Sequence, residues 1–265
     1  MPGQPDVAAE AMSDDLFAVT GKVALVTGGT SGIGLMIARG LVERGVRTYI
    51  VGRAPETCEE RARQLSRGGD CRSIVADLGT KAGVDRLVEQ FSAVESSLDI
   101  LVNNAGAMYE SPLADFSETG WDEVVDLNLK AVFFLTRQLL PLLRQAASQE
   151  AHASVINIGS VGALRVGPKE NYSYQAAKAG LHHLTGSLAR RLGPENITVN
   201  AVAPGFFPSR LTQIPDEQLA EVLKLVPRRR MGNAGDIIGC VVHLASRAGN
   251  YITGAVIPLE GGMSL

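Results

Sequence analysis

Two kinds of segment alternate along the chain from residue 22 onward. Short runs of consecutive apolar, often β-branched residues are each followed by a longer stretch whose apolar positions repeat with helical spacing. Unbroken apolar runs of this length are typical of strands that are covered on both faces of a sheet. The expected strands are 23–27, 47–51, 73–76, 98–102, 154–158, 197–202 and 255–258. Helices are expected at 33–43, 56–66, 81–93 and 121–143, and after the strand that ends at residue 158.

The strict succession of strand and helix predicts the fold class. It favours an α/β architecture: a single Rossmann-like, doubly wound domain with a mostly parallel central sheet of about seven strands and helices on both faces. No linker, repeat or low-complexity tract interrupts residues 20–265. We therefore expect one domain over 20–265, preceded by a flexible tail at residues 1–19.

Composition and charge remove several classes of function. The 265 residues are 45% apolar and 20% charged, with a formal net charge of −3, which is typical of a globular enzyme. No basic stripe indicates a nucleic-acid partner, and the run Arg228–Arg230 is interpreted as a solvated face. No segment reaches the ~18 consecutive apolar residues of a membrane span. Acidic residues near the N-terminus argue against a signal peptide.

The cysteines and histidines predict no metal site. Cys58, Cys71 and Cys240 are widely separated and lack the spacing of a disulfide framework or a metal centre. Free thiols suit a reducing compartment, so we expect a cytoplasmic protein. The pair His182-His183 is interpreted as packing or surface residues, because neighbouring helical side chains point in different directions and nothing nearby completes a ligand set.

A glycine-rich turn joins the first expected strand to the first helix. It reads Thr27-Gly28-Gly29-Thr30-Ser31-Gly32-Ile33-Gly34. Gly28 allows a sharp turn, Gly32 lets the backbone approach a pyrophosphate, and Gly34 lets the helix pack closely against the sheet. The helix N-terminus then offers N–H groups and a positive dipole end to the anion. The spacing is not G-x-G-x-x-G, but the position between strand and helix favours a dinucleotide-binding domain over a plain turn.

The end of the second expected strand bears on the choice of dinucleotide. The usual position of an acid that binds the adenosine ribose is occupied by Gly52, and Arg53 follows it. A guanidinium binds a 2′-phosphate that a carboxylate would repel. Ser31 adds no second cation, and a surface arginine is the alternative interpretation. The sequence favours NADP(H) over NAD(H).

Tyr174 and Lys178 stand four residues apart, which places them on one face of a helix. A phenol with its ordinary pKa of about 10 is a poor acid or base near neutrality. A neighbouring ammonium group is expected to lower the pKa of Tyr174 toward the working range. Tyr172 lies six residues before Lys178, off that face, so Tyr174 is the better candidate.

Two strand ends and one helix add polar groups. Ser160 follows the fifth expected strand, and Asn103-Asn104-Ala105-Gly106 ends the fourth. Both lie at the carboxyl edge of a parallel sheet, where ligands bind in such folds. Asn128 lies among apolar residues of the long helix, where its amide needs a partner.

Taken together, these motifs resemble the short-chain dehydrogenase/reductase family over nearly the whole of 22–262. The turn at 27–34, the Asn103–Gly106 motif, Asn128, Ser160 and Tyr174-x-x-x-Lys178 match in order and spacing, and Pro204-Gly205 follows them. Within the family, the segments around Ser160 and from 204 to 210 are most similar to bacterial NADP-dependent 3-oxoacyl reductases of the rhamnolipid-pathway type. Glu260-Gly261-Gly262 departs mildly from the Asp-Gly-Gly of some members.

The resemblance implies a catalytic role for four residues. Tyr174 is the expected proton donor or acceptor, Lys178 the group that lowers its pKa and holds the nicotinamide ribose, Ser160 the hydroxyl that binds the substrate oxygen, and Asn128 the anchor of a proton-relay water. Cofactor contacts are implied for Gly28, Thr30, Ser31, Gly32, Ile33, Gly34, Arg53, Asp77, Leu78, Asn104, Ala105, Gly106, Tyr174, Lys178, Pro204, Gly205, Phe207 and Ser209.

Three functions follow from the resemblance. The first is an NADPH-dependent reductase of a ketone or 3-oxoacyl group, because the expected substrate segments, including a loop near 206–230, are fairly apolar. The second is a sugar or polyol dehydrogenase, such as a gluconate 5-dehydrogenase. The third is a nicotinamide-binding regulator without turnover, which Ser160, Tyr174 and Lys178 argue against. A homo-oligomer, tetramer or dimer, is also implied.

Overall fold

The computed structural model describes residues 16–210, 212 and 214–265. Seven parallel strands form one sheet in the order β3-β2-β1-β4-β5-β6-β7. The strands are β1 (Val23–Thr27), β2 (Arg47–Gly52), β3 (Cys71–Val75), β4 (Ile100–Asn103), β5 (Ala153–Ile158), β6 (Ile197–Pro204) and β7 (Val256–Leu259). The helices are α1 (Gly32–Val42), α2 (Pro55–Leu65), α3 (Lys81–Ser92), α4 (Glu118–Val125), α5 (Ala131–Ala146), α6 (Tyr172–Leu192), α7 (Asp216–Leu223) and α8 (Ala234–Ala245).

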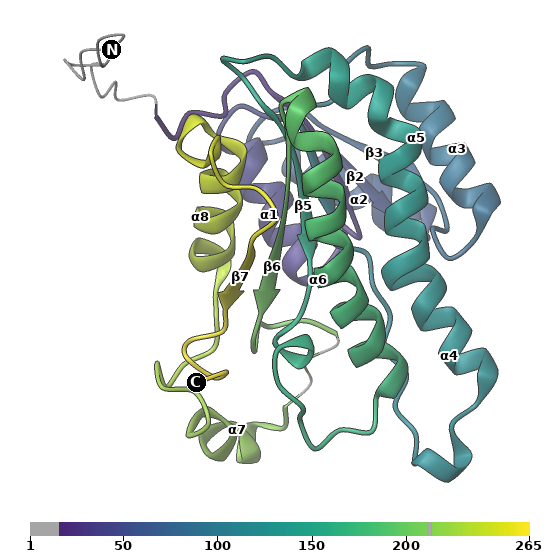
Figure 1. The fold of residues 1–265 in the computed structure, drawn as a ribbon, viewed down its shortest axis with the longest axis vertical. Coiled ribbons are helices and arrows are strands. Elements are labelled where there is room, and N and C mark those ends of the chain that lie inside the picture. Colours follow the sequence, from purple (N-terminus) through teal and green to yellow (C-terminus); the bar gives the residue numbers. More distant parts are fainter. Residues whose placement is uncertain (1–15, 211, 213) are drawn as a thin grey trace, which may run out of the picture.

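Helices cover both faces of the sheet (Figure 1). On one face, α3, α5 and α6 contribute side chains such as Leu87, Leu139 and Leu192 to an apolar cluster with the strands. On the other face, α1 and α8 pack Ile37 and Ile237 against the same strands. The predicted fold class, a Rossmann-like α/β sheet with two helical layers, is therefore confirmed.

The order of the strands in the sheet forms a crevice in which a ligand can bind. The chain runs outward from β1 to β3, returns to β4 beside β1, and then continues outward to β7. The connections that leave the carboxyl ends of β1 and β4 therefore diverge, which opens a crevice at that edge. In Figure 1 the same edge faces α7, beyond the ends of β6 and β7.

The prediction of a single helix at 121–143 is wrong, because two helices occupy this region. A π-helical turn, Asp126–Lys130, separates α4 from α5. Asn128 lies in this turn and is fully buried. A π turn adds one residue to a helical turn and is common at functional sites. The apolar spacing runs on through both helices, so the sequence pattern gave no sign of the turn.

Two helices near the C-terminal end of the chain were not predicted. One of them, α7, lies within the expected substrate loop. The other, α8, begins with a capping box in which Asn233 accepts from the Asp236 N–H while the Asp236 carboxylate accepts from the Asn233 N–H. An Asn-x-x-Asp pattern before an apolar run is a recognised helix start, so the signal for α8 was present in the sequence.

The expected tail at 1–19 falls mostly on residues 1–15, which lie outside the described residues. The remaining part contacts α8 and the turn after it. Leu16 accepts a hydrogen bond from the Ala248 N–H at 3.1 Å, and Val19 is buried in the α1–α8 cluster. In the part of the chain that the structure describes, no helix is both long and apolar enough to cross a bilayer.

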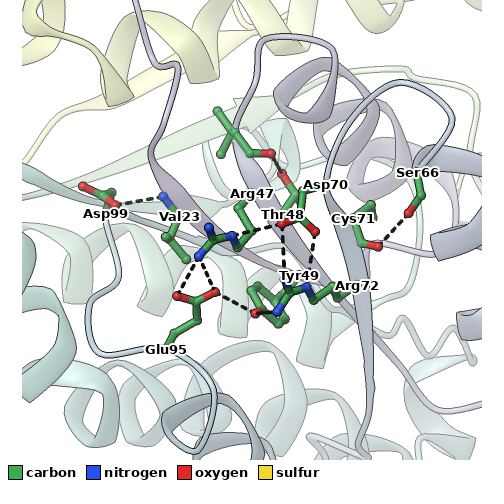
Figure 2. A network of polar contacts seen from close by, with 11 residues as sticks. Val23, Arg47, Thr48, Tyr49, Ser66, Asp70, Cys71, Arg72, Glu95 and Asp99 are labelled. Atoms are coloured by element: carbon green, nitrogen blue, oxygen red, sulfur yellow. Dashed lines mark hydrogen bonds and ion pairs between the residues drawn. The ribbon is translucent and has the colours of Figure 1, made fainter.

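A polar network holds the amino ends of β2 and β3 together (Figure 2). Arg47 donates from Nε to Asp70 at 3.0 Å and from Nη1 to both oxygens of Glu95 at 3.1 and 3.2 Å. The Tyr49 hydroxyl donates to Glu95 at 2.7 Å. Burial, and then the Glu95 carboxylate, raises the pKa of Tyr49 to about 12. This network lies at the opposite end of the strands from the ligand crevice, so we assign it to stability.

Candidate active site

The glycine turn after β1 has a backbone that glycine adopts readily and other residues rarely do. Gly28 and Gly32 have φ of +64° and +53°, a region that L side chains rarely adopt. A Cβ at Gly34 would lie 2.3 Å from the Gly28 carbonyl oxygen and 2.4 Å from the Asn104 amide nitrogen. The turn is therefore closed so tightly that any side chain at position 34 would push it away from the β4 segment.

The N-terminus of α1 keeps its N–H groups available. Among the described residues of this helix, the Ser31 side chain makes no capping hydrogen bond, and the first turn carries no acidic residue. Thr30 and Ile33 lie in the same turn, which faces the end of β1. Unpaired N–H groups and the positive dipole end suit a pyrophosphate at this place.

Thr27 organises the turn and was named from the sequence only as part of the motif. Its hydroxyl accepts from the backbone N–H groups of Asn104 and Ala105 at 2.9 and 3.0 Å. The Asn104 amide returns hydrogen bonds to the carbonyls of Thr27 and Gly28 at 2.9 and 3.2 Å. The ends of β1 and β4 are thereby joined by side chains. The available signal was a hydroxyl residue at the last position of a buried strand.

The residues expected around the adenosine lie at the ends of β2 and β3. Gly52 has no room for a side chain, since a Cβ would lie 2.7 Å from the Cys58 sulfur and 2.9 Å from Thr30. Arg53 follows directly and is exposed. Past β3, Asp77 is exposed, whereas Leu78 is 6% exposed. The Arg53 guanidinium therefore lies in solvent at the carboxyl edge of the sheet, directly after the side-chain-free position Gly52.

Asn128 is fixed by the chain segment that follows β4. Its Oδ1 accepts from the Ala107 N–H at 2.9 Å, and its Nδ2 donates to the Ala107 carbonyl at 2.8 Å. A Cβ at Gly106 would lie 3.2 Å from the same Oδ1. The expectation that this buried amide needs a partner is met by backbone groups of the loop.

Tyr174 and Lys178 lie on one face of α6, as expected. The Lys178 ammonium lies 5.9 Å from the centre of the Tyr174 ring and donates to the Ile158 carbonyl at 2.6 Å. Burial lowers the pKa of Lys178 to about 8. Burial also raises the pKa of Tyr174, and a hydrogen bond with Ser160 lowers it in part. The predicted lowering of the Tyr174 pKa by Lys178 is not found, because desolvation dominates and the ammonium is directed at a carbonyl.

Ser160 begins the turn after β5. Its hydroxyl accepts from the Gly162 N–H at 3.0 Å, and its carbonyl accepts from the Ala163 N–H at 3.1 Å. The backbone N–H of Ser160 donates to His182 Nε2 at 3.4 Å. Ser160 and Tyr174 therefore meet at the carboxyl edge of the sheet, with Lys178 behind them.

The segment after β6 closes the other side of the crevice. Gly205 donates to the Leu259 carbonyl at 3.0 Å, which extends the β6–β7 pairing past Pro204. A Cβ at Gly32 would lie 3.0 Å from the Ser209 Cβ, so this segment lies against the glycine turn. The Phe207 ring is 2% exposed within the α1–α8 cluster, and its packing there fixes the segment.

A cavity of about 290 Å³ opens beside this segment. Its lining mixes aromatic and charged groups. The lining residues are Phe206, Phe207, Val226, Arg228, Arg230, Gly232, Asp236, Leu259, Glu260 and Gly261. Ser160 and Tyr174 are not among them. Within the described chain, no cluster of three or more potential metal ligands occurs.

The expected site residues from β1, β4, β5, α6 and the segment after β6 thus converge on one edge of the sheet. An oxidoreductase of the dinucleotide-binding class has this combination of a tight glycine turn and a serine, tyrosine and lysine beside it. The comparisons with known proteins agree. A family model described as enoyl-(acyl carrier protein) reductase matches residues 27–264.

The chain also aligns with relatives over nearly their whole length. A rhamnolipids biosynthesis 3-oxoacyl-[acyl-carrier-protein] reductase of Pseudomonas aeruginosa is 45% identical over 252 residues, covering 94% of this chain and 98% of that protein. The 3-oxoacyl-[acyl-carrier-protein] reductase FabG of Escherichia coli is 37% identical over 247 residues, covering 92% and 97%. The chain therefore belongs to the short-chain dehydrogenase/reductase family.

Solved structures are similar along nearly the whole chain. The Pseudomonas aeruginosa RhlG/NADP active-site complex has a TM-score of 0.92 and 43% identity, covering 96% of this chain and 100% of that one. A candidate NAD(P)-dependent gluconate 5-dehydrogenase from Beutenbergia cavernae with bound NADP has a TM-score of 0.86 and 31% identity, covering 94% and 98%.

Proposed function

We propose that this protein is an NADPH-dependent reductase that converts the ketone of a 3-oxoacyl group to an alcohol. The observation that carries the proposal is the meeting of Ser160 and Tyr174 at the carboxyl edge of the sheet, with the buried Lys178 ammonium 5.9 Å from the Tyr174 ring centre. The relatives named as 3-oxoacyl reductases and the neighbour bound to NADP support the acyl substrate and the cofactor.

The chain's own residues fit the cofactor. The glycines at 28, 32 and 34 form a cradle that added Cβ atoms would fill, and the N-terminus of α1 supplies free N–H groups for the pyrophosphate. Arg53 would hold the 2′-phosphate, and Asp77 with Leu78 would border the adenine. Asn104 and Ala105, with Gly106, would line the middle of the crevice. Pro204 and Gly205, with the backbone of Phe207 and the Ser209 hydroxyl, would border the nicotinamide.

Each catalytic residue has a distinct role in this proposal. NADPH, when bound, supplies the hydride that attacks the carbonyl carbon. Tyr174 gives its phenolic proton to the carbonyl oxygen, so that an alcohol forms, and Ser160 orients that oxygen by a hydrogen bond. Lys178 would hold the nicotinamide ribose, and the hydrogen bond from Ser160 stabilises the phenolate that remains. Asn128 anchors the loop and a water through which a proton returns to the tyrosine.

Apolar side chains around the crevice favour an acyl substrate. Leu164 and Val166, on the loop after Ser160, are 40% and 85% exposed, and Leu225, at the end of the 206–230 loop, is 58% exposed. A polyhydroxy acid needs fixed hydrogen-bond partners that such groups do not offer. The alternative, a sugar or polyol dehydrogenase, is supported by the likeness to the candidate gluconate enzyme.

An exposed aromatic surface on α4 and α5 supports the proposed homo-oligomer, a tetramer or dimer. Trp121 is 41% exposed, and Phe133 and Phe134 are each 37% exposed. Exposed large apolar side chains of this kind occur at protein–protein interfaces. The free thiols of Cys58, Cys71 and Cys240 suit the proposed cytoplasmic location.

A substrate panel tests the proposal. Consumption of NADPH would be followed with acetoacetyl thioesters, 5-ketogluconate and bulky apolar ketones, for the wild type and for Tyr174→Phe. We expect turnover of the thioesters, a loss of roughly 10²- to 10⁴-fold in the variant, and near-normal NADPH binding. Turnover confined to the keto-sugar would replace the acyl proposal by the alternative, and full activity of Tyr174→Phe would reject the catalytic assignment.

A further inference from the structure

The backbone N–H of Ser160 is bound by a side chain of α6. The pairing of β5 with β6 ends at the Gly159 N–H, which donates to the Val202 carbonyl at 2.7 Å. One residue later the Ser160 N–H donates to His182 Nε2 at 3.4 Å, in a partly buried position. His182 therefore supplies the hydrogen-bond acceptor for the first backbone N–H beyond the β5–β6 pairing.

Gly159 shows that the contact is built into the sequence. A Cβ at position 159 would lie 2.1 Å from His182 Nε2 and 2.7 Å from Cδ2. The imidazole would have to rotate about its side-chain torsions to make room for that atom. Any residue other than glycine at 159 would displace the ring from the Ser160 N–H.

Sequence position connects His182 to the reaction site. Tyr174, Lys178 and His182 are spaced by four residues along α6 and share one helix face. The adjacent His183 is exposed and points elsewhere. One face of a single helix thus carries the proposed proton donor, the proposed ribose-binding cation and the acceptor that holds Ser160.

We propose that His182 is a positioning residue: its neutral imidazole accepts the Ser160 N–H at Nε2 and thereby holds the Ser160 hydroxyl where it binds the substrate oxygen. The kinetic consequence rests on the function proposed above, whereas the hydrogen bond itself does not. The geometry requires the tautomer that carries its proton on Nδ1, because a protonated Nε2 cannot accept.

The surroundings of His182 keep it neutral. Burial lowers its pKa, and the positive charge of Lys178 lowers it further. Gly159, Ser160 and Val202, which approach from the strand side, contribute only backbone groups and a hydroxyl. The imidazole is therefore neutral at pH 7 and becomes a cation only below its ordinary pKa of about 6.5. Protonation would remove the acceptor, so Ser160 should lose its alignment in acid.

Three variants separate positioning from packing. His182→Leu removes the acceptor, His182→Gln restores an acceptor near the Nε2 position, and His183→Leu is the matched control. With acetoacetyl thioester as substrate, we expect kcat of His182→Leu to fall about three- to tenfold, the effect of one hydrogen bond, with unchanged NADPH binding. His182→Gln should recover much of this loss, and His183→Leu should equal the wild type.

The pH profile is the readout that simple packing would not move. Because the pKa of His182 lies below its ordinary value, the acid limb of wild-type kcat should lie at pH values under the usual 6.5 or so, and it should be missing from His182→Leu and His182→Gln. If His182→Leu keeps the kcat of His183→Leu, or keeps the acid limb, the proposal is wrong. Should His182→Leu unfold, the comparison of His182→Gln with the wild type decides the matter by the same limb.

A measurement without substrate distinguishes this inference from the proposed function. Nitrogen-15 NMR of histidine-labelled protein reports which ring nitrogen carries the proton. We expect His182 to show a protonated Nδ1 and an unprotonated Nε2 at pH 7, even if 3-oxoacyl thioesters are not reduced. A protonated Nε2 would reject the positioning role whatever the substrate.

Discussion

Asn128 returns both halves of its side-chain amide to the backbone of one residue, Ala107. The two hydrogen bonds measure 2.9 and 2.8 Å, and the side chain is fully buried. Asn128 lies in the π turn between α4 and α5, opposite the loop after β4 that it binds. One helix residue thus fixes the position of the chain at the mouth of the crevice.

Replacing Asn128 by leucine should destabilise the fold. Both the N–H and the carbonyl of Ala107 would lose their partners, so we expect a fall of about 2–4 kcal/mol in the free energy of unfolding. Urea denaturation measures it. Asn250→Leu, the same exchange at an exposed position, should stay within about 0.5 kcal/mol. An equal effect of the two variants would show that the paired amide contributes nothing.

Arg53→Glu should change the cofactor preference. A carboxylate at the end of β2 repels a 2′-phosphate that the guanidinium would bind by charge-assisted hydrogen bonds. We expect the Kd for NADPH to rise about 10- to 100-fold while that for NADH stays level or falls, as measured by quenching of intrinsic fluorescence. Arg63→Glu, on the exposed face of α2, controls for the change in net charge. An unaltered ratio of the two Kd values would remove Arg53 from the site.

Local sequence signals were sufficient for the sheet and for the sheet edge at which the expected site residues lie. The strand at 23–27 was predicted with its observed bounds, because buried parallel strands consist of unbroken apolar runs. Strand ends in such a sheet share one edge, so Ser160 and Asn104 could be placed together without coordinates. Positive φ at Gly28 and Gly32 was predictable because only glycine adopts it readily.

Features that depend on tertiary contacts were not predictable in the same way. The π turn leaves the apolar spacing of α4 and α5 intact, so nothing in the pattern marks it. His182 was interpreted as a packing or surface residue, since the direction of a helical side chain relative to the next strand is not encoded in spacing. The rise of the Tyr174 pKa follows from desolvation, which a motif does not show.

The Glu95 carboxylate should be worth more to stability than an exposed ion pair. Its side chain is 7% exposed and accepts from both Arg47 and the buried Tyr49 hydroxyl. We expect Glu95→Leu to lower the free energy of unfolding by about 1–3 kcal/mol, since the Tyr49 hydroxyl loses its acceptor.

The double variant Glu95→Leu with Tyr49→Phe isolates that cause. Removing both polar partners should recover part of the loss, because no buried O–H donor is then left without an acceptor. Thermal denaturation of the two single variants and the double variant gives the coupling energy. Strict additivity would mean that the hydroxyl and the carboxylate act independently.

Lys178 should make the free protein less stable than a neutral residue would. Burial lowers its pKa from 10.5 to about 8, so the unfolded chain binds more protons than the folded one between these values. Stability contributed by this group therefore rises with pH from about 8 to 10.5 and is lowest below pH 8. At pH 7 Lys178→Met should stabilise the cofactor-free protein by about 1–3 kcal/mol while abolishing turnover.

Urea denaturation at pH 7 and near pH 10 should show this gain in stability shrinking, because the wild-type lysine neutralises as the pH rises. Lys130→Met, at a side chain 61% exposed, should show no such trend. A destabilised Lys178→Met at pH 7 would mean instead that the hydrogen bond to the Ile158 carbonyl outweighs the burial of the charge.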